Sequence, residues 1–307
     1  MKAPIAVLPV LALAACATAQ SPMAVQSPPP PAVPDATPIA VVETKAPEPP
    51  SGMQWMYGSG EGAAASIQTY RAFQQFVASA VNSRPRDSVV IARGSTFAQT
   101  TFVPCGRKPF AVVLDADETA VQNQGLEYAF AKRGVTSDRP VQNAWQAAPQ
   151  TASPAMPGAV DALNALRKMG VTVIFNTNRD NVNAASTAAS LNTAGVGPAE
   201  HLKTMFLRGD VDGQSSKDGR RWHVADRYCV VAMAGDQLGD FWEALNDRSL
   251  EPLARRAATS TGTVGSLWGR GWFLLSNPVY GPGLRGTIDQ VFAPDMRWEP
   301  VIQPENK

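Results

Sequence analysis

The chain has 307 residues, of which 44% are hydrophobic, and its formal net charge is +1. This composition supports a sizeable buried core, does not fit a disordered chain, and gives no basis for predicting nucleic-acid binding. Two histidines, His201 and His223, and three cysteines are too few for a zinc ribbon or for a histidine-based hydrolase of the usual layout. We therefore expect any reaction to run on carboxylates.

The first residues have the pattern of an export signal. A short apolar stretch from Ala3 to Ala15, interrupted by Pro4 and Pro9, leads to Cys16. This stretch is too short to span a bilayer. Residues 13–16 (LAAC) resemble the bacterial lipoprotein signal, so we predict a signal peptide over residues 1–15 and lipidation of Cys16. The alternative is an ordinary cleaved signal ending in small residues.

The next segment is rich in proline. Ten prolines lie between Ser21 and Ser51, among alanine, serine and few charges. Such a segment favours extended polyproline II at about 3.1 Å per residue, so it could reach on the order of 90 Å from a membrane. We predict that residues 16–52 are a tether; a recognition motif for a partner domain is the alternative.

Helices and apolar strands alternate through residues 53–300, which we predict to form the folded domain. The alternation predicts an α/β fold with a doubly wound parallel sheet and a small helical cap at about residues 120–155. In chain order the expected elements are a helix within Gln54–Asn82 (mainly 62–82), a strand at Ser88–Ala92, a strand from Val112, a helical region at Gln122–Ala148, a helix at Gly158–Met169, a strand at Val171–Asp180, a helix at Asn183–Thr193, a strand at Met205–Leu207, a helix at about Ser216–Asp226 and a strand from Tyr228.

The stretch VVLDADET, residues 112–119, carries the strongest chemical signal. Its apolar residues run directly into Asp115, and Asp117 follows two positions later. An apolar run without alternation indicates a central parallel strand, and ligands of open α/β sheets bind at the carboxyl ends of such strands. Two carboxylates on one side of extended backbone repel each other, and one would hold a proton unless a cation neutralised them. The pair therefore predicts a divalent cation.

Polar residues follow several predicted strands in a definite order: Asp115 and Asp117, then Thr177, Lys217, Asp236 and Asp240. This order resembles the haloacid dehalogenase (HAD) superfamily of phosphatases. The surrounding sequence, over nearly all of residues 54–281, is similar to the class C bacterial acid phosphatases, the lipoprotein 5'-nucleotidase family. The similar segments are PFAVVLDADET, APQTASPAMPGAVDALNAL, FNTNRD, SSKDGRR, GDQLGDF and SNPVYG.

The resemblance implies a Mg²⁺-dependent phosphomonoesterase. Asp115 would attack phosphorus and form an aspartyl phosphate, and Asp117 would act first as a general acid and then as a general base. Mg²⁺ would be held by the side chains of Asp115 and Asp236 and by the main-chain carbonyl of Asp117, with Asp240 among the ligands or next to them.

The resemblance also implies the residues that bind phosphate. Thr177 and Asn178, with neighbouring N–H groups, would hold phosphoryl oxygens, and Lys217 would offset negative charge. Lys203 is a rival for that role, but SSK followed by an arginine pair matches the family pattern. Arg179 either orients the site or pairs with an acid, and Asp240 could merely cap a helix.

Other features leave alternatives open. Cys105 and Cys229 precede two strands that are neighbours in the superfamily's sheet; an exported protein could oxidise them, but we favour two small buried hydrophobic side chains. Aromatic residues could stack on a nucleobase or belong to the core: Trp55, Tyr57, Trp145, Trp242 and Tyr280. The chain also departs from the family pattern, with Pro282, Gly283 and Leu284 where a tryptophan is usual, which leaves substrate preference open.

We therefore expect an acid phosphatase, with 5'-nucleotidase activity as its specific role and a broad acid phosphatase as the nearest rival. A catalytically silent, lipid-anchored binding or envelope-tethering protein is the alternative from another class. By resemblance to known lipoproteins, a lipidated Cys16 followed by Ala17 implies attachment to the outer membrane, facing the periplasm. A homodimer is expected by resemblance.

Overall fold

The computed structural model describes residues 48–148 and 153–300. The predicted signal peptide, Cys16 and most of the predicted tether lie outside these ranges. Among the helices within them, none combines the length and apolar character that crossing a membrane requires.

Five parallel strands form the central sheet, in the order β5-β4-β3-β6-β7. The strands are β3 (Phe110–Leu114), β4 (Thr172–Asp180), β5 (Met205–Arg208), β6 (Cys229–Gly235) and β7 (Trp272–Leu274). The chain first moves outward from β3 to β4 and β5 and then adds β6 and β7 on the other side. This confirms the predicted α/β fold with a doubly wound parallel sheet. The winding reverses at β3, the position where such sheets bind ligands.

The apolar side chains of β3 contribute to two hydrophobic cores, one on each side of the sheet. Val112 and Leu114 belong to one core cluster, and Ala111 and Val113 belong to the other. Successive side chains of a strand point to opposite faces, so a strand covered on both faces is apolar throughout. The sequence pattern of β3 therefore reflects its central position.

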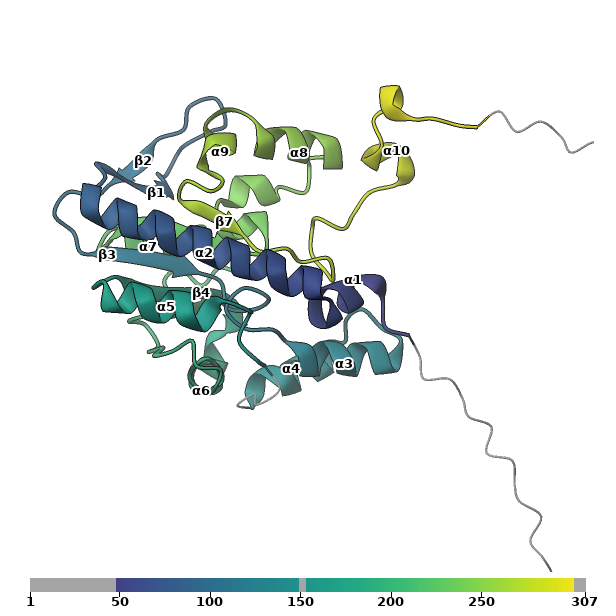
Figure 1. The fold of residues 1–307 in the computed structure, drawn as a ribbon, viewed down its shortest axis with the longest axis horizontal. Coiled ribbons are helices and arrows are strands. Elements are labelled where there is room, and N and C mark those ends of the chain that lie inside the picture. Colours follow the sequence, from purple (N-terminus) through teal and green to yellow (C-terminus); the bar gives the residue numbers. More distant parts are fainter. Residues whose placement is uncertain (1–47, 149–152, 301–307) are drawn as a thin grey trace, which may run out of the picture. The chain divides into compact units, whose positions relative to one another are not determined.

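Helices α2 (Gly60–Ser83), α5 (Ala159–Lys168) and α6 (Ala184–Thr193) contribute to the first core. Figure 1 shows α2 running beside α5. Tyr70, Phe73 and Val77 recur at helical spacing on α2 and are almost fully buried. Ser59 caps the helix by accepting a hydrogen bond of 2.9 Å from the N–H of Gly62. The predicted helix at 62–82 is confirmed.

Helices α7 (Asp218–Ala225) and α9 (Gly262–Leu267) contribute to the second core. A small antiparallel pair, β1 (Asp87–Ile91) and β2 (Phe102–Pro104), packs there too. The strand predicted at Ser88–Ala92 thus exists, but it lies outside the parallel sheet. Its partner β2 was not predicted.

A disulfide joins Cys105 to Cys229, with Cα atoms 4.5 Å apart. The favoured interpretation, two separate buried hydrophobic side chains, was therefore wrong. Cys105 precedes β3 and Cys229 begins β6, its direct neighbour in the sheet. The covalent bond ties the amino ends of the two strands whose carboxyl ends carry Asp115 and Asp236.

The region predicted as helical at Gln122–Ala148 contains two helices, α3 (Gln124–Arg133) and α4 (Arg139–Ala147). Gly134 ends α3 in the left-handed conformation, at φ 65°. Asp138 caps α4 by accepting from the N–H of Val141 at 3.2 Å. The remaining helical segments are α1 (Ser51–Met53), a π-helical turn (Gln54–Gly58), α8 (Pro252–Ser260), α10 (Ile288–Val291) and 3-10 turns at Asn181–Asn183, Leu238–Asp240, Glu243–Asn246 and Pro294–Met296.

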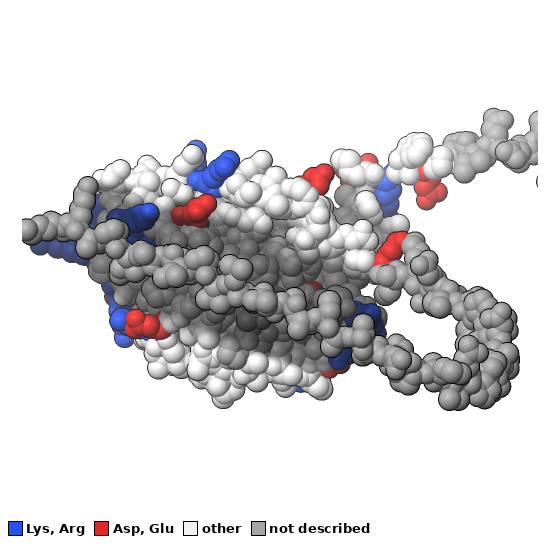
Figure 2. All heavy atoms as spheres, turned by 60° about the horizontal axis from the view of Figure 1, so that its bottom comes forward, with Lys and Arg blue, Asp and Glu red and all other residues white. Residues whose placement is uncertain are grey.

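Charged residues are dispersed on the described surface that Figure 2 presents. Basic and acidic side chains lie interspersed among neutral ones on this face. That distribution agrees with the net charge of +1.

Candidate active site

A cavity of about 480 Å³ opens at the carboxyl ends of the central strands. It brings together residues that lie far apart in the sequence, between Asp115 and Pro282, since parallel strands end at the same edge of the sheet. Seven residues were predicted for catalysis, metal binding or substrate binding. Six of them line the cavity: Asp115, Asp117, Asn178, Lys217, Asp236 and Asp240. The seventh, Thr177, is fully buried and does not line it.

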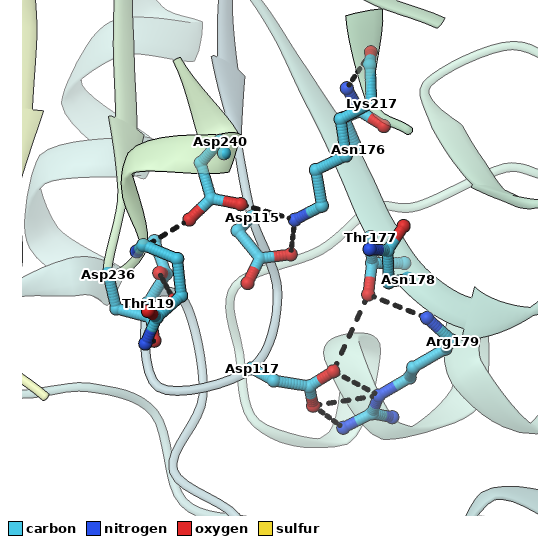
Figure 3. A network of polar contacts seen from close by, with 12 residues as sticks. Asp115, Asp117, Thr119, Asn176, Thr177, Asn178, Arg179, Lys217, Asp236 and Asp240 are labelled. Carbon is cyan, nitrogen blue, oxygen red and sulfur yellow. Dashed lines mark hydrogen bonds and ion pairs between the residues drawn. The ribbon is translucent and has the colours of Figure 1, made fainter. Parts of the chain in front are cut away.

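Asp115 and Lys217 form the centre of one half of this cavity. The ammonium nitrogen of Lys217 donates to Asp115 Oδ1 at 2.5 Å and to Asp240 Oδ1 at 2.7 Å (Figure 3). Burial and the neighbouring acids raise the pKa of Asp115 well above its ordinary value, although Lys217 acts in the opposite direction. Among the described residues, none donates a hydrogen bond to Asp115 Oδ2, so that oxygen is available for a ligand.

Asp236 lies next to this pair and is held by three donors. Thr119 Oγ1 donates to its Oδ1 at 3.1 Å, while Gln237 and Asn277 donate to its Oδ2 at 2.9 and 2.8 Å. Burial and the nearby Asp240 raise the pKa of Asp236 to about 7. Its carboxylate is therefore fixed in place while its negative charge remains poorly compensated.

Asp115, Asp236 and Asp240 fit a divalent cation. Each offers one carboxylate oxygen, and these oxygens lie within 4.8 Å of one another. Three buried carboxylates face a single lysine, an excess of negative charge that a hard cation would neutralise. The side chain of Asp117 is not part of this group.

Asp117 forms the other half of the cavity and has its own cation. The guanidinium of Arg179, itself 2% exposed, donates to Asp117 Oδ1 through Nη2 at 2.7 Å and Nε at 2.9 Å (Figure 3). Asn123 Nδ2 donates to the same oxygen at 2.8 Å. Burial alone would raise the pKa of Asp117, but Arg179 and Asn123 lower it below the ordinary value. Of the two roles left open for Arg179, pairing with an acid is the one observed.

Thr177 and Asn178 stand between the two halves, near the end of β4. The hydroxyl of Thr177 accepts from the N–H of Arg179 at 3.2 Å and lies 3.5 Å from Asp117 Oδ2. The buried Arg220 donates to the carbonyl of Thr177 at 2.5 Å and to Asn178 Oδ1 at 2.6 Å. Arg220, from α7, therefore fixes the β4 end relative to the helix that carries Lys217 at its start.

Glu118 forms a buried junction that the sequence did not reveal. Its carboxylate accepts from the N–H and the side-chain amide of Asn123 at 2.7 and 3.0 Å, from Tyr57 at 3.1 Å, and from Tyr280. Glu118 is 0% exposed and adopts φ 49°, in the left-handed region. Burial raises its pKa to about 7. Glu118 thus connects Tyr57 and Tyr280 to Asn123, which in turn contacts Asp117.

Comparisons with known proteins identify the family of the chain. Residues 60–283 match the family model described as HAD superfamily, subfamily IIIB (acid phosphatase). The chain belongs to this acid phosphatase family. It is therefore a phosphoric monoester hydrolase, and the resemblance seen in the sequence is confirmed.

Solved structures of the class C acid phosphatase from Bacillus anthracis share the fold of this acid phosphatase. One matches with a TM-score of 0.59 and 22% identity, over 76% of this chain and 84% of that chain. A second, with tungstate bound, matches with a TM-score of 0.58 at the same identity and coverage.

Lys217 lines the cavity of this acid phosphatase, whereas its rival Lys203 does not. Lys203 pairs with Glu200 at 2.9 Å and is 69% exposed, whereas Lys217 is 7% exposed and lies inside the site. Asp240 does accept from the main-chain N–H of Gln237 at 2.9 Å, as a helix-capping residue would, but its other oxygen binds Lys217. Asp240 therefore caps this turn and also contacts Lys217.

Of the aromatic residues considered for stacking, only some reach the cavity. Trp145 and Tyr280 line it. Trp242 is buried in the second core, and Trp55 and Tyr57 pack against the first core. A nucleobase bound in the cavity could therefore contact Trp145 and Tyr280 but not Trp242.

Proposed function

We propose that this acid phosphatase hydrolyses small phosphomonoesters through an aspartyl phosphate on Asp115, depends on Mg²⁺, and prefers 5'-nucleotides. The observation that carries the proposal is the convergence of Asp115, Lys217 and the acids Asp236 and Asp240 in one cavity. A nucleophile, a cation for phosphate and a set of hard oxygen ligands are what phosphoryl transfer requires.

In the first step a carboxylate oxygen of Asp115 forms a bond to phosphorus, and the bond between phosphorus and the leaving oxygen breaks. Lys217 holds Oδ1, which leaves Oδ2 for this attack. The protonated form of Asp117, which the lowered pKa confines to acidic pH, donates its proton to the leaving oxygen, so that the alcohol departs neutral. Arg179 fixes the orientation of Asp117 during the transfer.

In the second step water attacks phosphorus, and the bond to Asp115 breaks. Asp117, now ionised, accepts a proton from that water, and inorganic phosphate and the free Asp115 carboxylate result. Arg179 favours the ionised form that this step needs. Asn178 lines the cavity, is positioned by Arg220 and is suited to hold a phosphoryl oxygen. The fully buried Thr177 would have to become accessible to do the same.

Asp115 and Asp236 would hold the Mg²⁺ ion, with Asp240 beside them and the main-chain carbonyl of Asp117 as a further ligand. When bound, the ion neutralises phosphate charge and the excess carboxylate charge of the site. Asp236 is suited to this role because Thr119, Gln237 and Asn277 fix its orientation. Trp145 and Tyr280 on the cavity wall support the preference for nucleotides, since aromatic rings stack on bases.

The experiment is a turnover assay with p-nitrophenyl phosphate, AMP and nicotinamide mononucleotide, each with Mg²⁺ and with EDTA. We expect Mg²⁺-dependent hydrolysis of all three and higher kcat/KM for the nucleotides. Equal kcat/KM values would favour a broad acid phosphatase, and no turnover would favour a silent tethering protein. Lys217→Gln should lose activity, while the matched variant Lys203→Gln, in an exposed ion pair, should keep it.

We further propose that the protein is lipidated at Cys16, attached to the outer membrane by the tether of residues 16–52, and dimeric. Several acyl chains on one cysteine would give stable attachment. Cys16→Ser should move the protein from the membrane fraction to the soluble fraction. Light scattering on the soluble variant would measure its oligomeric state.

A further inference from the structure

A second cavity, of about 430 Å³, adjoins the active site. It lies between helix α8, the end of β7 and the segment that follows Pro282. The two cavities share Asp236, Gln237, Tyr280 and Pro282, so these residues form the boundary between them.

The boundary between the cavities is compact. Gln237 Nε2 donates to the carbonyl of Tyr280 at 3.3 Å. Gly281 follows at φ 111°, and a Cβ on it would collide with the side chain of Gln237. The residues that line both cavities therefore form a thin boundary between them.

The two cavities have opposite charge. Four aspartates and two glutamates line the first, together with Arg179 and Lys217. Three arginines line the second, Arg255, Arg256 and Arg285, and its one acid is Asp236 at the boundary. Asp236 already belongs to the candidate cation site. The second cavity is thus a basic pocket on the side of the active site away from Asp117 and Arg179.

The arginines of this pocket are oriented but not neutralised. Arg255 Nε donates to the carbonyl of Leu245 at 2.9 Å, and Arg285 Nη2 donates to the carbonyl of Leu250 at 2.6 Å. Within residues 48–148 and 153–300, no carboxylate forms an ion pair with either arginine. The exposed Asp247 is held mainly by Ser249, and the charge of Arg285 makes only a further contribution to lowering its pKa. Burial and the charge of Arg285 lower the pKa of Arg255.

We propose that Arg255 and Arg285 form an anion subsite, and that among its phosphomonoester substrates this acid phosphatase prefers those that carry a second anionic group on the alcohol that leaves. The reacting phosphate would lie beside Asp115, and the second phosphate or carboxylate would lie between the two arginines. This inference rests on the proposed function for the position of the reacting phosphate.

Three physical arguments support this class of substrate. Guanidinium groups bind phosphate and carboxylate through paired hydrogen bonds, and two half-buried guanidinium groups repel each other until an anion lies between them. The carbonyl contacts hold both side chains in place before an anion arrives, which reduces the entropy lost on binding. Leu253, Leu274 and Leu284 also line the pocket, so an apolar linker between the two anionic groups would find apolar contacts.

The experiment compares matched substrates that differ only at the far end. Monophosphates of α,ω-alkanediols with three to eight carbons carry a terminal hydroxyl, and their bisphosphates and ω-carboxyalkyl phosphates carry a terminal anion. We expect one chain length at which the anionic substrates exceed the hydroxyl substrate about tenfold in kcat/KM. Comparing the phosphate and carboxylate series shows which anion the subsite takes.

Variants connect the preference to the two arginines. Arg255→Gln and Arg285→Gln should each reduce the preference severalfold, and the double variant should abolish it, with p-nitrophenyl phosphate turnover unchanged. Arg270→Gln, at an exposed arginine that lines neither cavity, controls for the loss of one positive charge. No preference at any chain length, or a preference retained in the double variant, would overturn the proposal.

A binding measurement separates this inference from the proposed function. Titration calorimetry with Asp115→Asn compares the same bisphosphates and monophosphates without requiring turnover. Tighter binding of a bisphosphate that disappears in Asp115→Asn/Arg255→Gln/Arg285→Gln would support the subsite even if the catalytic assignment failed. Equal binding of both series would reject the subsite even in an active phosphatase.

Discussion

The two halves of the active site shift the pKa values of two aspartates in opposite directions. Asp115 is paired with a lysine that it shares with Asp240, and its pKa is raised by burial and neighbouring acids. Asp117, two residues later, is paired with Arg179, which is in an ion pair with no other carboxylate of the described residues, and the pKa of Asp117 is lowered despite burial. Figure 3 shows the two side chains facing these separate cations.

The difference indicates how one short loop can supply two chemical roles. The half around Asp115 has an excess of negative charge and is suited to a divalent cation and a nucleophile. The half around Asp117 is balanced and rigid, and is suited to moving a proton at a fixed position. Environment, rather than residue type, thus separates the roles of the two aspartates.

The largest expected effect comes from replacing the nucleophile. Asp115→Asn should lower kcat by about 10⁴-fold or more, since an amide cannot form the acyl phosphate intermediate. Circular dichroism should show an unchanged fold. The matched control is Asp180→Asn, in an exposed ion pair with Arg208, which should change kcat less than about twofold. Substantial activity in Asp115→Asn would exclude the nucleophilic role.

Replacing the partner of Asp117 should give a smaller, pH-dependent effect. Arg179→Gln removes the charge that lowers the pKa of Asp117, so the pH above which kcat/KM falls through loss of the donated proton should rise. Because Arg179 also holds Asp117 in position, kcat should fall by about tenfold in this variant. The fall should be larger for alkyl phosphates than for p-nitrophenyl phosphate. Arg208→Gln is the exposed control. A pH profile that does not move would contradict the assigned pairing.

The effect of Glu118 should appear mainly in stability. Its pKa rises from 4.5 to about 7 on folding, so the folded protein holds the proton more tightly and loses roughly 3 kcal/mol of stability through this group as pH increases between those values. Glu118→Gln lacks this loss, but its NH2 group only donates, so it cannot accept the hydrogen bonds that Asn123 and Tyr280 make to one oxygen of Glu118.

We therefore expect Glu118→Gln to be less stable than the unmodified protein at pH 4.5 and to recover relative to it by pH 8. Urea unfolding in EDTA at both pH values measures the difference, and Glu200→Gln, an exposed glutamate, is the control. A difference that stays constant with pH would show that Glu118 does not titrate between these values.

The sequence predicted the parts of the fold with strong local patterns. The apolar runs of β3 and β6 indicated buried parallel strands, and the order of polar residues after them indicated the site. Strand β7 has only three residues, and helices α8 and α10 have no buried residues, so local periodicity did not reveal them. The partner of β1 depends on antiparallel pairing across a loop, which the residues of β1 alone do not specify.

The sequence also could not choose partners between distant residues. Arg179 meets Asp117 across 62 positions, and Glu118 meets Tyr57 and Tyr280 across 61 and 162 positions. The disulfide closes a separation of 124 residues. Such pairs are created by the fold, and residue type or spacing along the chain does not determine them.

The most direct test of the account is to trap the phosphorylated residue in Asp117→Asn. With p-nitrophenyl phosphate the leaving group departs without a donated proton, while hydrolysis of the acyl phosphate lacks its base. We predict a rapid release of about one p-nitrophenolate per active site. Acid quenching, borohydride reduction and tandem mass spectrometry should then locate the modification at Asp115. Steady release without a burst, or a modification at another residue, would contradict the account.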